Sequence, residues 1–244
     1  AVTTVNVTAE NDAPTLTAGA ILAPVAEDSA DPAGSTVGSL FTGKFTDPDD
    51  PNATIAGVVV VGNTATAAEG VWQYKTSGGS GWFDIGDVNG GQADLVLAAD
   101  TLIRFVPAAD YNGTPPTLTV HGLDSSYAGS FTVDATRAEI ADASVGSGGT
   151  AAVSGGTAAI STSVTEVNDA PVAVDDILSD IAEDNGPRTS AFSELIGNDP
   201  DRGAANESGQ GVTVVTVGNA VGGTVAIVAG EVVFTPFANF NGQA

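Results

Sequence analysis

The sequence contains no cysteine, and it has only 6 basic residues against 30 acidic ones. Without cysteine, disulfides, thiolate nucleophiles and zinc sites built on sulfur are all excluded. The formal net charge of -24 opposes binding to nucleic acid or to an anionic membrane, because few cations are present to neutralise phosphate. No run of about 18 apolar residues occurs, so we expect no membrane span.

Signatures of catalysis are also scarce. His121 is the single histidine, and no Gly-x-Ser-x-Gly elbow or phosphate-binding loop is present. A single histidine in a strand-like context packs or faces solvent more often than it acts as a base. Carboxylates are numerous enough for a glycosidase pair, but they cluster in turn-like segments rather than on one cleft. We therefore expect that the protein is not an enzyme.

The composition favours strands and turns. Hydrophobic residues make up 42% of the chain, mostly Val, Ala, Ile and Leu, and 31 glycines and 12 prolines interrupt them throughout. Apolar or alternating runs predict strands at residues 55–61, 71–74, 82–85, 102–106, 117–120, 159–165, 212–217, 224–228 and 232–235. Many short strands at this spacing predict a β-sandwich. The glycine-rich residues 77–81 predict the turn of an aromatic hairpin over residues 70–87.

An internal repeat organises the chain. Four motifs of the first copy return in order in the second: residues 7–14 as 164–171, 26–28 as 182–184, 47–49 as 199–201, and 105–113 as 234–242. The offset falls from 157 residues at Pro14 and Pro171 to 129 residues at Gly113 and Gly242, so the first copy carries an insertion. We predict the last strand of a preceding repeat at residues 1–10, a long repeat at 11–167 with the inserted hairpin, and a repeat at 168–244 that lacks its final strands.

These motifs resemble the bacterial cadherin-like (Ig-like) tandem repeats of giant RTX-type adhesins and related surface proteins. The resemblance spans residues 168–244 and extends more loosely to the first copy. It implies an all-β fold of two tandem Ig-like or cadherin-like β-sandwich domains, the second one truncated. It also implies secretion to the extracellular cell surface and calcium at the domain junctions, with neighbouring repeats of the same protein as partners. The expected function is that of a structural extender, or spacer, rigidified by calcium.

The resemblance also assigns metal ligands, since carboxylates and carbonyl oxygens are the groups that calcium prefers. At the junction between the copies the expected ligands are Glu166, Asn168, Asp169, Glu183, Asp184, Asp199 and Asp201. The equivalent set of the first copy is Glu10, Asn11, Asp12, Glu27, Asp28, Asp47 and Asp49. The alternative is that the Asn-Asp and Asp-Pro pairs only form turns.

Two further hypotheses concern binding. The first copy is alternatively a glycan-binding or peptide-binding module of the same adhesin, which uses an open calcium site or the aromatic hairpin with Trp72, Tyr74 and Trp82. Alternation along the strand favours the core for Trp72 and Tyr74, which share one face. In addition, residues 3–8 align with residues 160–165, the final strand of the first copy. We therefore expect self-association in which this strand of one molecule adds to the open edge of another.

Overall fold

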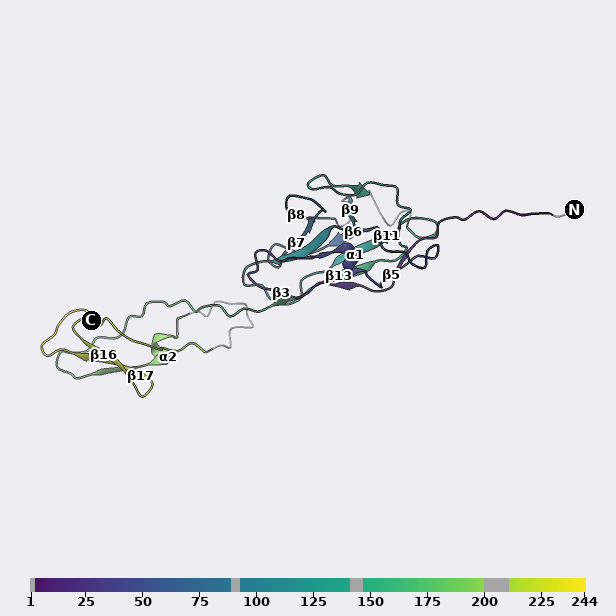
Figure 1. Cartoon of the computed structure of the whole chain (residues 1–244). Helices are drawn as coiled ribbons and strands as arrows, with labels where there is room; N and C mark the ends of the chain where they lie inside the picture. Colours follow the sequence, from purple (N-terminus) through teal and green to yellow (C-terminus); the bar gives the residue numbers. More distant parts are fainter. Residues whose placement is uncertain (1–2, 89–92, 141–146, 200–210) are drawn as a thin grey trace. The chain divides into compact units, whose positions relative to one another are not determined.

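The computed structural model describes residues 3–88, 93–140, 147–199 and 211–244 (Figure 1). The chain divides into two compact units, Ala1–Val167 and Asn168–Ala244, called here the first and the second unit. Among the described residues the helices are α1 (Val37–Leu40) and α2 (Phe192–Leu195), of four residues each. The remaining regular structure is strand, which confirms the predicted all-β fold class.

The first unit is a sandwich of two main sheets, joined by two short strand pairs. The larger sheet has the order β12 (Glu139–Ile140), β9 (Asp94–Ala98), β6 (Gly57–Asn63), β11 (Leu118–Leu123), β13 (Ala158–Ser161) and β2 (Ala20–Ile21). The smaller sheet has the order β4 (Ser35–Thr36), β10 (Leu102–Pro107), β7 (Gly70–Lys75) and β8 (Phe83–Asp84). The short pairs are β1 (Thr15–Leu16) with β5 (Phe45–Thr46), and β14 (Val164–Thr165) with β3 (Val25–Ala26).

The central strand β6 shows why residues 55–61 form a continuous apolar run. Successive side chains of a strand point to opposite faces of the sheet. Val58 and Val60 lie in the main core between the two sheets. Val59, between them, packs on the other face with Val96 and Leu123. Both faces of β6 are therefore covered by apolar side chains.

The predicted aromatic hairpin is present, because β7 pairs antiparallel with β8. Its rings, however, belong to the core: Trp72 is 0% exposed and Tyr74 is 1% exposed. The indole N–H of Trp72 donates to the carbonyl of Pro116 at 2.8 Å, and the Tyr74 hydroxyl donates to the carbonyl of Asp134 at 3.0 Å. The hypothesis that Trp72 and Tyr74 bind a ligand is corrected accordingly, since neither ring offers a face to solvent.

Trp82 is half-buried against an arginine. The guanidinium of Arg104 lies 3.9 Å from the centre of the Trp82 ring, and its Nε–H donates to Gln73 at 2.9 Å. Arg104 also donates to the carboxylate of Asp31 at 2.5 Å and to the carbonyl of Pro32 at 3.0 Å. A cation over the face of an aromatic ring is attracted by the quadrupole of the ring. The Arg104 guanidinium covers a face of the Trp82 ring, and Trp72 and Tyr74 are buried. The predicted ligand platform of these three aromatic residues therefore does not form.

In the described part of the second unit, a three-stranded sheet has the order β15 (Arg188–Ala191), β17 (Glu231–Pro236) and β16 (Gly223–Val228). The predicted strands at 224–228 and 232–235 are confirmed. Residues 212–217 were predicted as a strand, and they form none. A strand exists only by pairing, and among the described residues no segment pairs with this one; Val215 is 82% exposed. No large apolar side chain in the described part of this unit is buried.

Candidate metal centre

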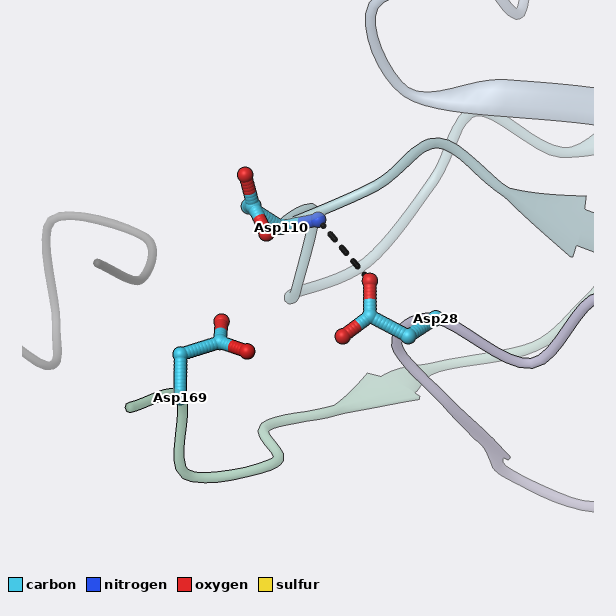
Figure 2. A group of neighbouring side chains, drawn as sticks. All are labelled: Asp28, Asp110 and Asp169. Carbon is cyan, nitrogen blue, oxygen red and sulfur yellow. Dashed lines mark hydrogen bonds between the residues drawn. The ribbon is translucent and has the colours of Figure 1, made fainter. Parts of the chain in front are cut away.

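Two acidic turns meet at the β3 end of the first unit. Asp28 follows β3 and Asp110 follows β10, and both have left-handed backbones with φ of 63° and 57°. The backbone N–H of Asp110 donates to the Asp28 carboxylate at 3.3 Å. A carboxylate oxygen of each lies within 4.8 Å of one from the other. Figure 2 draws this pair together with Asp169, the second residue after Val167.

A buried carboxylate lies beside this pair in the sequence. Glu27 is 1% exposed, and its two oxygens accept from different segments. One accepts the backbone N–H of Val167 at 2.5 Å, and the other accepts the side-chain amide of Asn112 at 2.9 Å. Hydrogen bonds to an ionised carboxylate are among the stronger ones in proteins. Glu27 therefore ties the last residue of the first unit to the turn that carries Asp110.

The direction of two strands explains this convergence. β3 and β14 are parallel, with Val25 opposite Val164 and Ala26 opposite Thr165. Parallel neighbours end at the same edge of a sheet, so the residues after Ala26 and those after Thr165 emerge side by side. Gly113 then joins the group through two backbone hydrogen bonds with Val164, of 2.7 and 3.0 Å. Three segments distant in the sequence thus meet at one edge.

Two carboxylates of like charge lie close together at this edge. Two carboxylates separated by 4–5 Å repel each other by about 1 kcal/mol even in water. Asp28 and Asp110 are both exposed, so solvent screens them without removing this repulsion. The group consists of oxygen ligands, the kind that calcium prefers, and no histidine or cysteine among the described residues belongs to it. Nearby, burial and the charge of Glu69 raise the pKa of Tyr111.

The ligand set predicted for the first copy is divided between two places. Glu27 and Asp28 lie beyond β3, and the others precede β1 or follow β5, at the opposite end of the first unit (Figure 1). There the Asp12 N–H donates to the Asp49 carboxylate at 2.6 Å, and the Asp49 N–H donates to Asp47 at 2.9 Å. The Asn11 amide donates to the buried Asp124 at 3.2 Å, and Glu10 is exposed. Sequence reasoning treated these residues as one set because it could not place the turns.

The second unit repeats the arrangement of Asp28. The N–H of Asn239 donates to the Asp184 carboxylate at 3.4 Å, and Asp184 has a φ of 59°. By this correspondence Glu183 and Asp184 are the counterparts of Glu27 and Asp28. They follow Ile181 and Ala182, just as Glu27 and Asp28 follow β3. The prediction that they share a calcium site with the linker after Val167 stays a prediction, and the first unit has its own Glu-Asp pair, Glu27 and Asp28.

The remaining predicted ligands are placed as follows. Asp199 accepts the backbone N–H of Val174 at 2.7 Å. Glu166 and Asn168 are exposed, and Asn168 donates to the carbonyl of Asp169 at 3.1 Å. Asp201 lies outside the described residues.

Sequence reasoning missed Asp110 and Asn112. Both lie in residues 105–113, which the sequence analysis gives as a repeated motif without assigning it a metal ligand. The available signal was the repeat itself, because Asn239 and Asn241 stand at the matching positions of the second copy. A repeated polar turn next to a repeated Glu-Asp pair indicates a shared local structure.

Replacing Glu27 by Gln should destabilise the first unit by about 1–3 kcal/mol, because the buried NH₂ group of the glutamine then faces a donor, either the Val167 N–H or the Asn112 amide. Urea unfolding followed by tryptophan fluorescence measures this, since both tryptophans, Trp72 and Trp82, lie in the first unit. The matched control is Glu183→Gln at the exposed equivalent position, for which we expect a change within about 0.5 kcal/mol. Equal effects of the two substitutions would contradict the anchoring role of Glu27.

The β-sandwich of the first unit, and the acidic turn that recurs in the second unit, are those of a repeated β-sandwich module. Residues 167–244 match the family model described as a cadherin-like domain. No curated protein and no solved structure matches the chain. The match supports a cadherin-like fold, and domains of this kind are typically adhesion or structural modules that generally bind calcium, not enzymes. Among the described residues, no helix is long and apolar enough to span a bilayer.

Proposed function

We propose that this chain is an extender segment of a secreted, calcium-dependent surface adhesin of the RTX type. The cadherin-like match of residues 167–244 supports an adhesive or extender role. The tandem repeat supports a modular array, in which each unit contacts its neighbours. The rings of Trp72 and Tyr74 are in the core, so nothing at the hairpin favours a glycan or peptide ligand.

The observation that carries the proposal is the position of Val167. Its backbone N–H is held by the buried Glu27, directly beside the Asp28 and Asp110 pair. Two residues of extended chain span at most about 7 Å, so Asn168 and Asp169 start within a short reach of both carboxylates. The connecting segment therefore begins at an acidic group instead of leaving the unit freely.

The residues that would hold calcium are Asp28, Asp110 and Asp169, with Asn168 as a further oxygen ligand. When bound, calcium supplies the positive charge that turns the repulsion among these carboxylates into attraction. Glu27 fixes the start of the linker, and Asp28 and Asp110 are fixed by their mutual hydrogen bond. A ligand set shared between a rigid unit and its linker restricts the directions that the linker can take.

The extender role predicts that calcium narrows the distribution of distances between the two units. Spin labels at Ser77→Cys and Thr224→Cys, both exposed, report this distance by pulsed electron resonance in a chain that has no other cysteine. We expect a broad distribution in chelator and a narrower one with calcium. The same experiment with Asp110→Asn should stay broad. Equal widths with and without calcium in the unsubstituted chain would contradict the proposal.

A further inference from the structure

The first unit contains a cavity of about 280 Å³ beside β10. It is formed by residues 22–26, by the loop that leads into β4, and by Arg104 and Phe105 of β10. Its lining is mostly apolar, and Arg104 is the one charged residue that lines it. Ligand pockets in proteins are mostly apolar with a few placed polar groups, and this volume is at the lower end of their range. The cavity therefore has the composition of a site for a small ligand.

Arg104 differs from the other basic residues in its burial and in its partner. It is 6% exposed. The other described basic residues are each partly exposed, namely Lys44, Lys75, Arg137 and Arg188. Charged side chains are seldom buried unless they are paired. Arg104 is paired with Asp31, whose side chain is 87% exposed, so the carboxylate that balances this buried guanidinium lies largely in water.

The hydrogen bonds of Arg104 fix its orientation and leave one nitrogen unused. Nε donates to Gln73, whose own amide donates to Asp84 at 2.8 Å. Nη1 donates to Asp31 and to the carbonyl of Pro32. Nη2 has no acceptor among the described residues, and it is in contact with solvent. The planar guanidinium, which can donate five hydrogen bonds, therefore keeps donors available for a further acceptor.

The loop beside Arg104 is held close to it by a glycine. Gly34 has a φ of 75°, which an L side chain rarely adopts. A Cβ at this position would lie 2.6 Å from the Ile103 carbonyl oxygen, 3.0 Å from the Trp82 ring and 3.2 Å from the Arg104 Cβ. The loop thus packs directly on Arg104 and Trp82, and this side of the cavity is shaped by the fold itself.

We propose that this cavity binds a small organic acid, a carboxylate on an apolar body, and that Arg104 binds the carboxylate. The carboxylate accepts from Nη2 and displaces Asp31 from Nη1, because a guanidinium and a carboxylate pair through two parallel hydrogen bonds. The apolar body lies against the side chains of Leu22 and Val25, which line the cavity. Asp31 is already largely exposed, so it moves fully into water when the ligand enters.

Titration calorimetry of the 244-residue chain with 3-phenylpropionate tests this site. The titration is done in chelator, which separates its outcome from that of the calcium proposal. We expect saturable binding to one site. The matched amide, 3-phenylpropionamide, should bind at least about tenfold more weakly, because it lacks the charge that Arg104 pairs with. No saturable binding up to about 10 mM acid, or equal affinities for the acid and the amide, would overturn the proposal.

Two variants place the bound acid at Arg104. Arg104→Lys keeps the charge but loses the planar fork, so it should weaken binding by at least about tenfold. Since Arg104 also holds the loop, Asp31→Asn is the more informative variant. It removes the competing carboxylate from an exposed position and should tighten binding by at least about threefold.

The matched control is Asp100→Asn, which makes the same change of charge at an exposed turn of the first unit that does not line the cavity. We expect it to leave the affinity unchanged. Urea unfolding of each variant shows whether it is folded as the unsubstituted chain is. An affinity that Asp31→Asn leaves unchanged, or that both substitutions raise equally, would refute binding at Arg104.

Discussion

Saturating calcium should raise the melting temperature of the chain by about 5–10 °C. A ligand that binds only the folded state stabilises it by about 2.7 kcal/mol at about one hundred times its Kd. For a domain of this size, each 1 kcal/mol corresponds to about 2–4 °C. The stabilisation arises because Asp28 and Asp110 lie within 4.8 Å of each other and repel until a divalent cation is bound. Calorimetry with and without chelator measures the shift.

Asp110→Asn is the sharpest variant for this test. It should abolish most of the calcium shift, because it removes a charged ligand. It should leave the melting temperature in chelator unchanged or slightly higher, because it also removes the repulsion with Asp28. The backbone accepts the change, since Asn239 occupies the matching position of the second unit at the same φ of 57°. Most unstrained surface substitutions change stability little, so a large loss in chelator would point to a structural role instead.

The control for charge is Asp100→Asn, which removes one carboxylate from an exposed turn between β9 and β10 of the first unit. It should keep the full calcium shift. General screening of a chain with a net charge of -24 would affect both variants equally. If calcium shifts the two variants by the same amount, the Asp28 and Asp110 pair is not the binding site.

Trp72→Ala should destabilise the first unit by about 3–5 kcal/mol, the cost of removing a large aromatic side chain from a packed core. The ring is 0% exposed and packs edge-on against Phe105 at 5.2 Å between ring centres. Its removal also leaves the Pro116 carbonyl without the indole donor. Urea unfolding followed by the fluorescence of Trp82 measures the loss.

Trp82→Ala provides the comparison. This ring is half-buried and touches the Arg104 guanidinium, so we expect a smaller loss of about 1–2 kcal/mol, measured by the fluorescence of Trp72. A ligand platform would give the opposite pattern, with little effect of Trp72 on stability and a marked effect on binding. An unfolding midpoint for Trp72→Ala equal to that of the unsubstituted chain would contradict the core assignment.

Strand positions were predictable where alternation and turn residues agreed. The hairpin around residues 77–81 and the buried run at residues 55–61 both form as expected, because these signals are local in sequence. Residues 212–217 show the limit of such signals. Their alternation is as clear as that of β16, but a strand also needs a neighbour at hydrogen-bonding distance, and alternation does not supply one.

The candidate metal centre was predictable only in part. The resemblance selected Asp28 and Asp169, and it placed calcium near the linker. It grouped Glu27 and Asp28, which follow β3, with Asp47 and Asp49, which follow β5, because the sequence alone does not show at which end of a unit each turn lies. The parallel pairing of β3 with β14 decides the matter, since it fixes which turn emerges next to Val167.

By itself the sequence determined the all-β class, the two-copy organisation and the acidity that favours a hard cation, because composition, period and repeat are properties of the chain alone. The tertiary structure decided that Asp110, 82 residues away from Asp28, donates a hydrogen bond to it. It also decided that Glu27 is buried against Val167, and that Trp72 and Tyr74 face the core. These facts depend on which strands become neighbours and in which direction they run, and hydrophobic alternation specifies only the face on which a side chain lies.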